Sequence, residues 1–488
     1  MRTTFTTSKS APAKVDAVVV PVAASGAVPA GLGHTRAQLS ALGFDGAAGQ
    51  TLALPGSSSA KATLLVGVGE VKDLTPNSLR NIAASAARAA SRFASVSTTL
   101  ASVGRGSAKA NAQAVVEGMA LALHRWVDLK NDKGGLPKLT SVALVAGAGT
   151  AEVKAGMDNG IATASAVCLA RDLANTPPSH LTARQLADRA VEVGRTGGLK
   201  VTVYNRDQLI AMGCGGLVGV NAGSVEPPRM VKLEYRPTKA SGNIVLVGKG
   251  VMYDSGGISL KPSDPSHASM KMDMSGAAAV LATMGALRSL KVKAKVTAYL
   301  MCTDNLPSGS ALKLGDVLTM RNGKTVEIHN TDAEGRLILA DGLSLGAESK
   351  PDAMLDIATL TGACMGALGK HMAGILGNND GVLSQLKAAS SRTDELVWEL
   401  PFHRPYRALL DSNVADMRNI GGPLAGATTA ALFLGEFVGQ TPWAHIDMAG
   451  PMDADGDNGW LNRGATAYGT RLLIDFCANF KKPAGKNK

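Results

Sequence analysis

The stretch Thr325–Glu348, TVEIHNTDAEGRLILADGLSLGAE, decides how this chain is interpreted, because it joins a short apolar run to a helical pattern. Residues 325–329 are typical of a strand, and the apolar spacing from 337 to 348 predicts a helix. Asp332 and Glu334 therefore fall in a strand-to-helix loop, where open α/β sheets bind ligands. Two hard oxygen donors suggest a metal site. Acids are also favoured in the first turn of a helix, so a capping role stays open at this point.

A second candidate segment lies upstream of the first. Residues 243–247, NIVLV, form an apolar run that predicts a strand buried on both faces. We expect the glycine-rich stretch that follows, GKGVMYDSGG, to be a loop in which glycines let the backbone approach a ligand. This loop and its continuation carry four candidate side chains, which are Lys249, Asp254, Lys261 and Asp273.

The basic residues near these loops also have plainer interpretations. Lys249 reads equally as a surface charge or a phosphate contact in a Gly-Lys-Gly turn, since lysine is rarely buried. Lys261 reads as a solvated lysine beside a proline, and Arg336 as a helix-surface arginine paired with an acid. For the two lysines, the residue types alone favour these plainer interpretations over a role in a metal site.

Together these segments resemble the leucine aminopeptidases of the M17 type, a family of zinc- or manganese-dependent, two-metal exopeptidases. The octapeptide NTDAEGRL at 330–337 is the hallmark of that family. Four further matches occur in the same order along the chain. They are NTPP at 175–178, DIATLTGA at 356–363, SNVADM at 412–417 and WAHIDMAG at 443–450. The resemblance covers about residues 160 to 480 and is weak before them.

The resemblance implies a site for two divalent cations, Mn²⁺ or Zn²⁺, with Mg²⁺ as a further candidate. One ion would be held by Asp254, Asp332 and Glu334. The other would be held by Lys249, Asp254, Asp273 and Glu334, so that Asp254 and Glu334 bridge. A lysine ligand must be a neutral amine, which a nearby dication favours.

The resemblance also implies two catalytic residues. Lys261 would stay protonated and polarise the scissile carbonyl. Arg336 would hold a bicarbonate ion that acts as general base, a task that suits a planar guanidinium. The free α-amine of the substrate would coordinate one metal and so restrict cleavage to the N-terminal residue. The sequence has no HExxH motif, and we interpret His267 and His329 as bystanders.

Six positions match the family's pocket for the N-terminal side chain, namely Met270, Thr359, Leu360, Gly362, Ala449 and Met452. Two methionines among small residues make an adaptable apolar hole that favours leucine or methionine over acidic residues. Any of these residues could instead be core. The loop between Lys261 and Asp273 is one residue longer than is usual in the family, with the extra residue near 264–266. This change affects the pocket rim, and Asp264 is a minor alternative ligand.

The 488 residues, 45% of them hydrophobic, predict a globular α/β protein of two domains. We expect a smaller, macro-like N-terminal α/β domain over 1–155 and a connecting helix over 156–178. A larger catalytic α/β domain with a mixed central sheet is expected over 179–488. The helical pattern of the connector begins near 151 and ends before two prolines. In the N-terminal domain we expect strands at 17–22, 63–68 and 141–146 and helices at 79–94 and 111–123.

The cysteines and the N-terminus predict a cytoplasmic protein. Five cysteines, an odd number spread widely along the chain, are typical of reduced, buried thiols. Residues 1–14 have no apolar segment of the kind that secretory signals contain. No run of eighteen apolar residues occurs, so we expect no membrane span.

The charge distribution leaves a second class of function open. The formal net charge is +11, and residues 1–160 hold 16 Lys and Arg against 9 Asp and Glu. We expect Arg80, Arg88 and Arg92 to share one helical face, which would attract phosphates. A basic DNA-binding or architectural protein is thus the alternative, although no aromatic platform or DNA motif accompanies these arginines. Another two-metal hydrolase, such as a phosphatase, is a third possibility. The leading prediction is a cytosolic leucyl aminopeptidase that acts on peptides and, like the family, forms a homohexamer.

Overall fold

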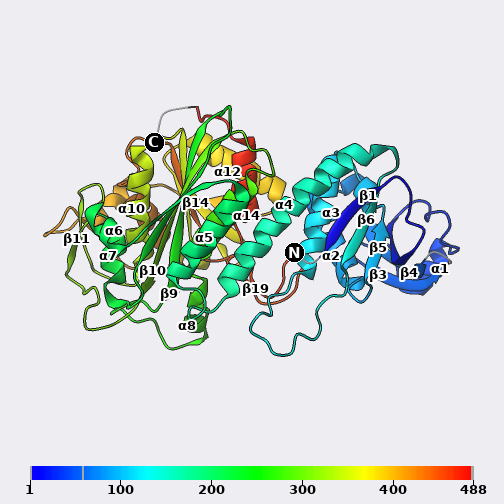
Figure 1. Cartoon of the computed structure of the whole chain (residues 1–488), viewed down its shortest axis with the longest axis horizontal. Coiled ribbons are helices and arrows are strands. Elements are labelled where there is room, and N and C mark those ends of the chain that lie inside the picture. Colours follow the sequence, from blue (N-terminus) through cyan, green and yellow to red (C-terminus); the bar gives the residue numbers. More distant parts are fainter. Residues whose placement is uncertain (1–2, 58–59, 485–488) are drawn as a thin grey trace. The chain divides into compact units, whose positions relative to one another are not determined.

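The computed structural model describes residues 3–57 and 60–484. Contacts between residues divide the chain into two compact units (Figure 1). One unit is Met1–Cys168 with Ala454–Gly464, and the other is Leu169–Asp453 with Ala465–Lys488. Helix α4, Thr150–Asn175, carries the chain from the first unit into the second. The α/β class with two domains is confirmed.

The N-terminal unit is built on a six-stranded sheet with the order β1-β6-β5-β2-β4-β3. Neighbouring strands are parallel except for β3 and β4, which are antiparallel. The strands are β1 Thr4–Ser8, β2 Val15–Ala23, β3 Thr51–Ser57, β4 Ala60–Gly69, β5 Ser95–Thr98 and β6 Ser141–Val145. The helices before α4 are α1 Arg36–Ala41, α2 Pro76–Ala89 and α3 Ala108–Leu123. All three predicted strands and both predicted helices are present.

Two of the three arginines expected on a basic helical face have acidic partners inside this unit. Arg80 is buried and its Nε lies 2.8 Å from Glu117 Oε2. Arg88 reaches the returning segment Ala454–Gly464, where its Nη1 lies 2.6 Å from Asp457 Oδ2. Arg92 lies beyond the end of α2 at Ala89, so the prediction of one shared face is wrong. The sequence shows the periodicity of the arginines but not the distant acids that neutralise them.

The second unit is built on an eight-stranded mixed sheet with the order β15-β14-β17-β13-β9-β10-β8-β7. The central four strands are parallel to one another, and β13 and β17 are buried along their whole length. Such burial on both faces is typical of parallel strands covered by helices. The strands are β7 Lys200–Tyr204, β8 Arg229–Tyr235, β9 Asn243–Asp254, β10 Lys295–Asn305, β13 Ala353–Ala358, β14 Met372–Gly377, β15 Leu396–Glu399 and β17 Trp443–Asp447. A mixed central sheet is therefore confirmed.

Helices α9 and α10 cover opposite faces of this sheet. A Cβ on Gly248 would lie 2.7 Å from Cα of Ala277 in α9, Ser275–Ala286. A Cβ on Gly342 of α10, Gly335–Glu348, would lie 2.7 Å from Val247 Cγ1. Side chains of successive strand residues point to opposite faces of a sheet. Helix α10 therefore lies on the face of Val247 and Lys249, and α9 lies on the face of Gly248 and Gly250.

The remaining helices of this unit differ in length, from five residues in α8 to fifteen in α5. They are α5 Ala183–Gly197, α6 Arg206–Ala211, α7 Gly215–Val220, α8 Pro265–Ser269, α11 Gly362–Leu368, α12 Asp380–Thr393, α13 Gly426–Gly435 and α14 Thr470–Asn479. Within the residues described, no helix has both the length and the apolar content needed to cross a bilayer. All five cysteines are free and buried, as expected.

Two expectations about the strands next to the candidate site are wrong. The strand expected over 243–247 continues to Asp254, so Lys249 lies in β9 and not in a loop. The strand before the NTDAEGRL motif is β12, Thr325–Glu327, which belongs to a separate sheet with β11 Val317–Thr319 and β16 Met417–Arg418. The motif is thus reached from a small three-stranded sheet, whereas Lys249 and Asp254 come from the large one.

Candidate metal centre

Lys249 is a buried lysine on the central strand β9. Its Nζ lies 2.8 Å from Asp273 Oδ2 and 2.8 Å from Glu334 Oε1, and it donates a 2.9 Å hydrogen bond to the carbonyl of Thr359. The side chain passes over the first residue of α10, where a Cβ on Gly335 would lie 2.6 Å from Lys249 Cε. The structure therefore excludes the surface interpretation of Lys249, which is only 3% exposed.

Asp254 ends β9 and is held from both sides. Its Oδ1 accepts hydrogen bonds from the Gly256 amide at 2.9 Å and from Asn305 Nδ2 at 2.8 Å. Its Oδ2 lies 2.8 Å from Lys261 Nζ. Gly256 has a φ of +90°, and a Cβ there would lie 2.8 Å from Asp332 Oδ1, so the turn after β9 requires glycine.

Asp332 and Glu334 lie in the segment that joins β12 to α10, as predicted. One oxygen of each and one of Asp254 lie within 4.8 Å of one another, a spacing that suits a single cation. Asp332 Oδ1 lies 2.6 Å from Lys261 Nζ. Glu334 stands at the N-cap position of α10 but makes no capping hydrogen bond. The capping interpretation of these acids is therefore not supported.

Asp273 follows the 3-10 helix Met270–Met272 and completes the set of acids. It is 5% exposed, and its Oδ1 accepts a 2.7 Å hydrogen bond from Thr359 Oγ1. In the part of the chain that the structure describes, the four carboxylates form ion pairs only with the ammonium groups of Lys249 and Lys261, so the acids outnumber their paired bases by two. Within the described residues, Glu334 Oε2 has no hydrogen-bond partner although it is buried.

This excess of buried negative charge shifts several pKa values in the same direction. Burial, together with repulsion from Asp254, raises the pKa of the carboxyl groups of Glu334, Asp273 and Asp332. Burial alone would lower the pKa of Lys249, but the surrounding carboxylates outweigh it and raise that pKa. The cluster therefore binds protons tightly when it has no other cations, and divalent metal ions would displace those protons. The donor set and the buried, unpartnered oxygen fit a metal site.

Arg336 is buried on the first turn of α10. Its Nη1 donates a 2.8 Å hydrogen bond to the carbonyl of Asn419, and its buried Nε has no partner within the described part of the chain. Burial lowers the pKa of Arg336 to about 10, against the opposing charges of Glu334 and Asp447, so the guanidinium stays protonated at neutral pH. A buried, charged and incompletely bonded guanidinium fits a small oxyanion. Arg336 is thus not a helix-surface residue.

The six predicted pocket residues occupy three segments of the chain, and one of them, Thr359, contacts an acid of the cluster. Thr359 contacts Asp273, while the amides of Leu360 and Ala449 both donate to Asp447 Oδ1, at 3.2 Å and 3.3 Å. The other three are Met270 in the 3-10 helix, Gly362 at the start of α11, and Met452, whose carbonyl accepts from the Thr466 amide. Gly362 is exposed, and Met270, Leu360, Ala449 and Met452 are half-buried. Of the six, only Thr359 is buried, so they are not all core residues.

Four polar residues that organise the site were missed by the sequence analysis. Asn305 Nδ2 bonds both Asp254 and the carbonyl of Thr331, which ties the end of β9 to the NTDAEGRL motif. Thr331 Oγ1 donates to the carbonyl of Gly256 and accepts from the Ser259 amide. The other two are Asn419 and Asp447. Asp447 stands in the WAHIDMAG match, which was the one signal for it.

The longer loop and the two neighbouring histidines stay outside the acid cluster. Asp264 caps α8 by accepting a 2.8 Å hydrogen bond from the Ser266 amide, so its carboxylate binds the start of a helix and is not part of the acid cluster. His267 stacks on Tyr253 with ring centroids 5.8 Å apart. His329 Nε2 lies 3.1 Å from Glu327. These contacts agree with the bystander interpretation of both histidines.

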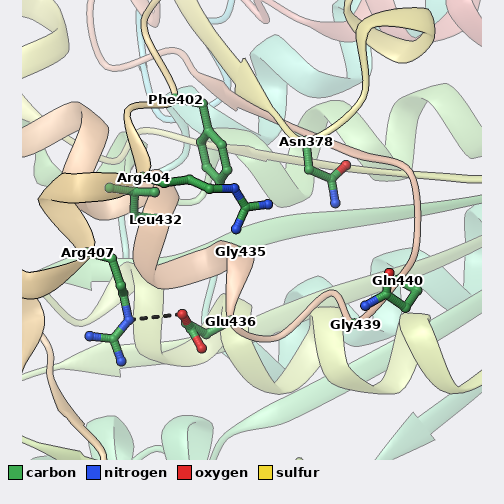
Figure 2. Close-up of a pocket in the computed structure, with 9 residues that line it drawn as sticks. All are labelled: Asn378, Phe402, Arg404, Arg407, Leu432, Gly435, Glu436, Gly439 and Gln440. Carbon is green, nitrogen blue, oxygen red and sulfur yellow. Dashed lines mark hydrogen bonds and ion pairs between the residues drawn. The ribbon is translucent and has the colours of Figure 1, made fainter. Parts of the chain in front are cut away.

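A separate hollow of about 350 Å³ lies where α13 ends, and Figure 2 shows the residues that line it. Arg407 points toward Glu436, and its Nε donates a 2.9 Å hydrogen bond to that carboxylate. Lys324 pairs with the same carboxylate. The hollow contains none of the predicted site residues, and its one acid is already neutralised.

Comparisons with known proteins agree with this geometry. Residues 168–474 match the catalytic domain of the cytosol aminopeptidase family, and residues 19–133 match its N-terminal domain. A probable cytosol aminopeptidase of Alkaliphilus metalliredigens is 38% identical over 461 residues, which cover 92% of each chain. Another, from Chloroherpeton thalassium, is 42% identical over 445 residues, covering 86% of this chain and 87% of that one. The structure titled bottromycin maturation enzyme BotP in complex with Mn has a TM-score of 0.88 and 36% identity, and the match covers 95% of this chain and 99% of BotP.

Proposed function

The chain belongs to the cytosol aminopeptidase family, and from this premise we propose that it is a leucyl aminopeptidase. In this proposal the protein is a two-metal exopeptidase that removes N-terminal leucine and other apolar residues from peptides. The family is metal-dependent and acts on peptides. The identity of the ions, the preference for leucine and the roles of individual residues are the parts that we propose.

The observation that carries the proposal is the excess of buried carboxylates around Lys249 and Lys261. Four acids and two lysines face one another, and a buried oxygen of Glu334 has no partner within the described residues. An arrangement that only stabilised the fold would pair each buried charge. A single unpaired buried charge costs about 3–5 kcal/mol, which is comparable to the free energy of unfolding of a whole domain. Cations that the chain itself does not supply remove this imbalance.

Five residues hold the metals in this proposal. Asp254, Asp332 and Glu334, whose oxygens gather within 4.8 Å, hold one ion. Lys249 and Asp273, together with Asp254 and Glu334, hold the second. Two divalent cations bound there would lower the pKa of a water molecule and orient it for attack on a carbonyl. Mn²⁺ and Zn²⁺ both suit the donor set, and Mg²⁺ remains a candidate.

The two catalytic residues of this proposal have different roles. Lys261 is 18% exposed in its side chain, so its ammonium group can meet a substrate. Burial alone would lower the pKa of Lys261, but Asp254, Glu334 and Asp332 together outweigh it and raise that pKa, so Lys261 stays charged and stabilises a developing oxyanion. Arg336 binds bicarbonate through its unpartnered Nε. Bicarbonate bound there would supply a general base.

Substrate preference comes from the group formed by Met270, Thr359, Leu360, Gly362, Ala449 and Met452. The two methionines are half-buried and flexible, so they adapt to unbranched or branched apolar side chains. A phosphate ester would find no basic residue among these six. This composition favours a peptide with N-terminal leucine or methionine over the substrate of a phosphatase.

We propose three further properties, the first two from the family and the third from the ion pairs of the N-terminal unit. The protein acts in the cytoplasm, as the name of its relatives implies. It assembles as a homohexamer. It does not act as a DNA-binding protein, because Arg80 and Arg88 are neutralised by Glu117 and Asp457 and only Arg92 of the three is left exposed.

Hydrolysis of leucine p-nitroanilide by the purified chain, loaded with Mn²⁺ or Zn²⁺, tests the proposal. We expect turnover that chelators abolish and that Asp332→Ala or Glu334→Ala eliminates together with metal binding. Glutamate p-nitroanilide should be a much poorer substrate. If protein with confirmed bound metal left leucine p-nitroanilide and Leu-Gly intact, the proposed activity would be wrong.

A further inference from the structure

We infer that Asn419 is a positioning residue that holds the metal-binding segment 328–334 in place, and this inference rests on the proposed function of that segment. Asn419 follows β16 directly and is 0% exposed. It is not one of the residues expected to bind metal or substrate. Its importance comes from the number of hydrogen bonds that its side chain makes to one short stretch of backbone.

All hydrogen bonds that the side-chain amide of Asn419 can make go to the backbone of this segment. Oδ1 accepts from the amide of His329 at 2.9 Å and from that of Asn330 at 3.3 Å. Nδ2 donates to the carbonyl of Asn330 at 2.6 Å and to that of Ala333 at 3.4 Å. An asparagine side chain offers two donor and two acceptor positions, and all four are used. The two amides require an acceptor, so the orientation of the side-chain amide is determined.

The segment needs such support because it has no regular structure. It leaves the three-residue strand β12 at Glu327 and enters α10 at Gly335. Between these points Thr331, Ala333 and Glu334 are buried, and unpaired amides and carbonyls there are costly, whereas His329 is exposed. The clamped residues flank Asp332 and directly precede Glu334, so a shift of the segment moves both carboxylates relative to Asp254.

The backbone of Asn419 performs a separate task. Its amide donates to the carbonyl of Glu327 at 3.0 Å, which extends the pairing of β12 with β16. Its carbonyl accepts from Arg336 Nη1 at 2.8 Å. These bonds do not depend on the side chain. Substitution of Asn419 should therefore loosen the metal segment while the contact to Arg336 is retained.

Asn378 provides a matched control. It is also a buried asparagine in the same unit, with Oδ1 accepting from the Trp443 amide at 2.7 Å and Nδ2 donating to the carbonyl of Thr441 at 3.0 Å. It lines the separate hollow in Figure 2, and its side-chain hydrogen bonds go to Thr441 and Trp443 rather than to residues 328–334. Asn378→Ala and Asn419→Ala each remove a buried amide, and they differ in whether that amide holds the metal ligands.

The test is Mn²⁺ binding by calorimetry, with thermal unfolding and kcat for leucine p-nitroanilide, on the full-length wild type, N419A and N378A. We expect both variants to unfold at lower temperature. Only N419A should bind Mn²⁺ about 10- to 100-fold more weakly, because the loss of outer-shell partners typically has this effect. Its kcat at saturating Mn²⁺ should also fall. Backbone amides of His329 and Asn330 should exchange hydrogen faster in N419A than in N378A.

Two results would overturn the inference. One is an Mn²⁺ affinity in N419A equal to that of wild type. The other is a loss of Mn²⁺ affinity in N378A as large as that in N419A, because general destabilisation would then explain both losses. Absence of Mn²⁺ binding in the wild type would instead overturn the proposed function. If N419A does not fold, Asn419→Ser, which keeps a shorter polar side chain, takes its place in the same comparison with the same two overturning results.

Discussion

Replacement of Gly335 by alanine tests whether the position of Lys249 is essential. An added Cβ would lie 2.6 Å from Cε, 2.7 Å from Nζ and 2.8 Å from Cδ of Lys249. The side chain of Lys249 has little freedom to move, because Asp273, Glu334 and the carbonyl of Thr359 hold its ammonium group. Ordinarily a change from glycine to alanine in a helix stabilises it by about 1 kcal/mol at most.

At this position we expect the steric conflict to outweigh the gain in helix propensity. Overpacking of a well-filled site costs about 1–3 kcal/mol. We therefore expect G335A to lower the free energy of unfolding, measured by urea denaturation, by an amount within that range. Displacement of the Lys249 amine should weaken Mn²⁺ binding, measured by calorimetry, by at least about tenfold.

Gly366 is the control for this prediction. It lies on exposed helix α11, and a Cβ there would have no heavy atom within 4 Å. G366A should therefore be neutral or stabilise the protein by up to about 1 kcal/mol. If G335A matched the wild type in both stability and Mn²⁺ affinity, the packing of Lys249 against Gly335 would not determine the metal site and the reasoning would be refuted.

Three further predictions address other parts of the molecule. Arg336→Lys should retain Mn²⁺ binding but lower kcat with added bicarbonate, because an ammonium group cannot bind an oxyanion through two parallel hydrogen bonds; an unchanged kcat would contradict the assigned role. Asp457→Asn removes an acid that Arg88 and Arg125 share at 2.6 Å and 2.7 Å, and since the site is partly exposed the free energy of unfolding should fall by about 1 kcal/mol or less. Gel shifts of the same variant on duplex DNA should still show no binding at physiological salt, whereas binding would revive the DNA-binding alternative. Burial raises the pKa of four thiols to about 12, so a thiol reagent at pH 8 should modify them only after denaturation; these are Cys214, Cys302, Cys364 and Cys477.

Local patterns in the sequence predicted most elements, and the resemblance of the motifs to a known family supplied the set of acids. The apolar spacing after Gly335 predicted α10 to within two residues, and the acids of the NTDAEGRL motif lie where a strand-to-helix connection was expected. The helical pattern from 151 to 175 matches α4, Thr150–Asn175. These features depend on short-range periodicity, which a single sequence contains.

The path of β9 could not be predicted from local propensity. Glycine disfavours strands, so the GKG sequence was interpreted as a loop. In the structure Gly248 remains in β9 because it is paired on both sides, with β10 and β13, and Gly250 remains in the strand through its pairing with β10. Both glycines lie close to Ala277 of α9, where no larger side chain would fit. The glycines are thus explained by the packing of a helix and not by a turn.

The polar residues that support the site could not be predicted because their partners are far away in the sequence. Asn419 bonds residues about ninety positions earlier, through the pairing of β12 with β16. Asp447 reaches Thr361, 86 positions away, and organises the predicted pocket. Arg88 finds Asp457 at a separation of 369. No local signal shows such pairs, and only the tertiary fold reveals them.

The most direct test of the account is to count Mn²⁺ ions bound per chain while measuring release of the N-terminal residue from a leucine-headed peptide. The account predicts two ions per chain, release of leucine alone as the first product, and loss of both binding and activity in Glu334→Ala. Cleavage inside the peptide, or full activity in the Glu334 variant, would contradict the claim that this cluster of carboxylates and lysines is a dinuclear exopeptidase centre.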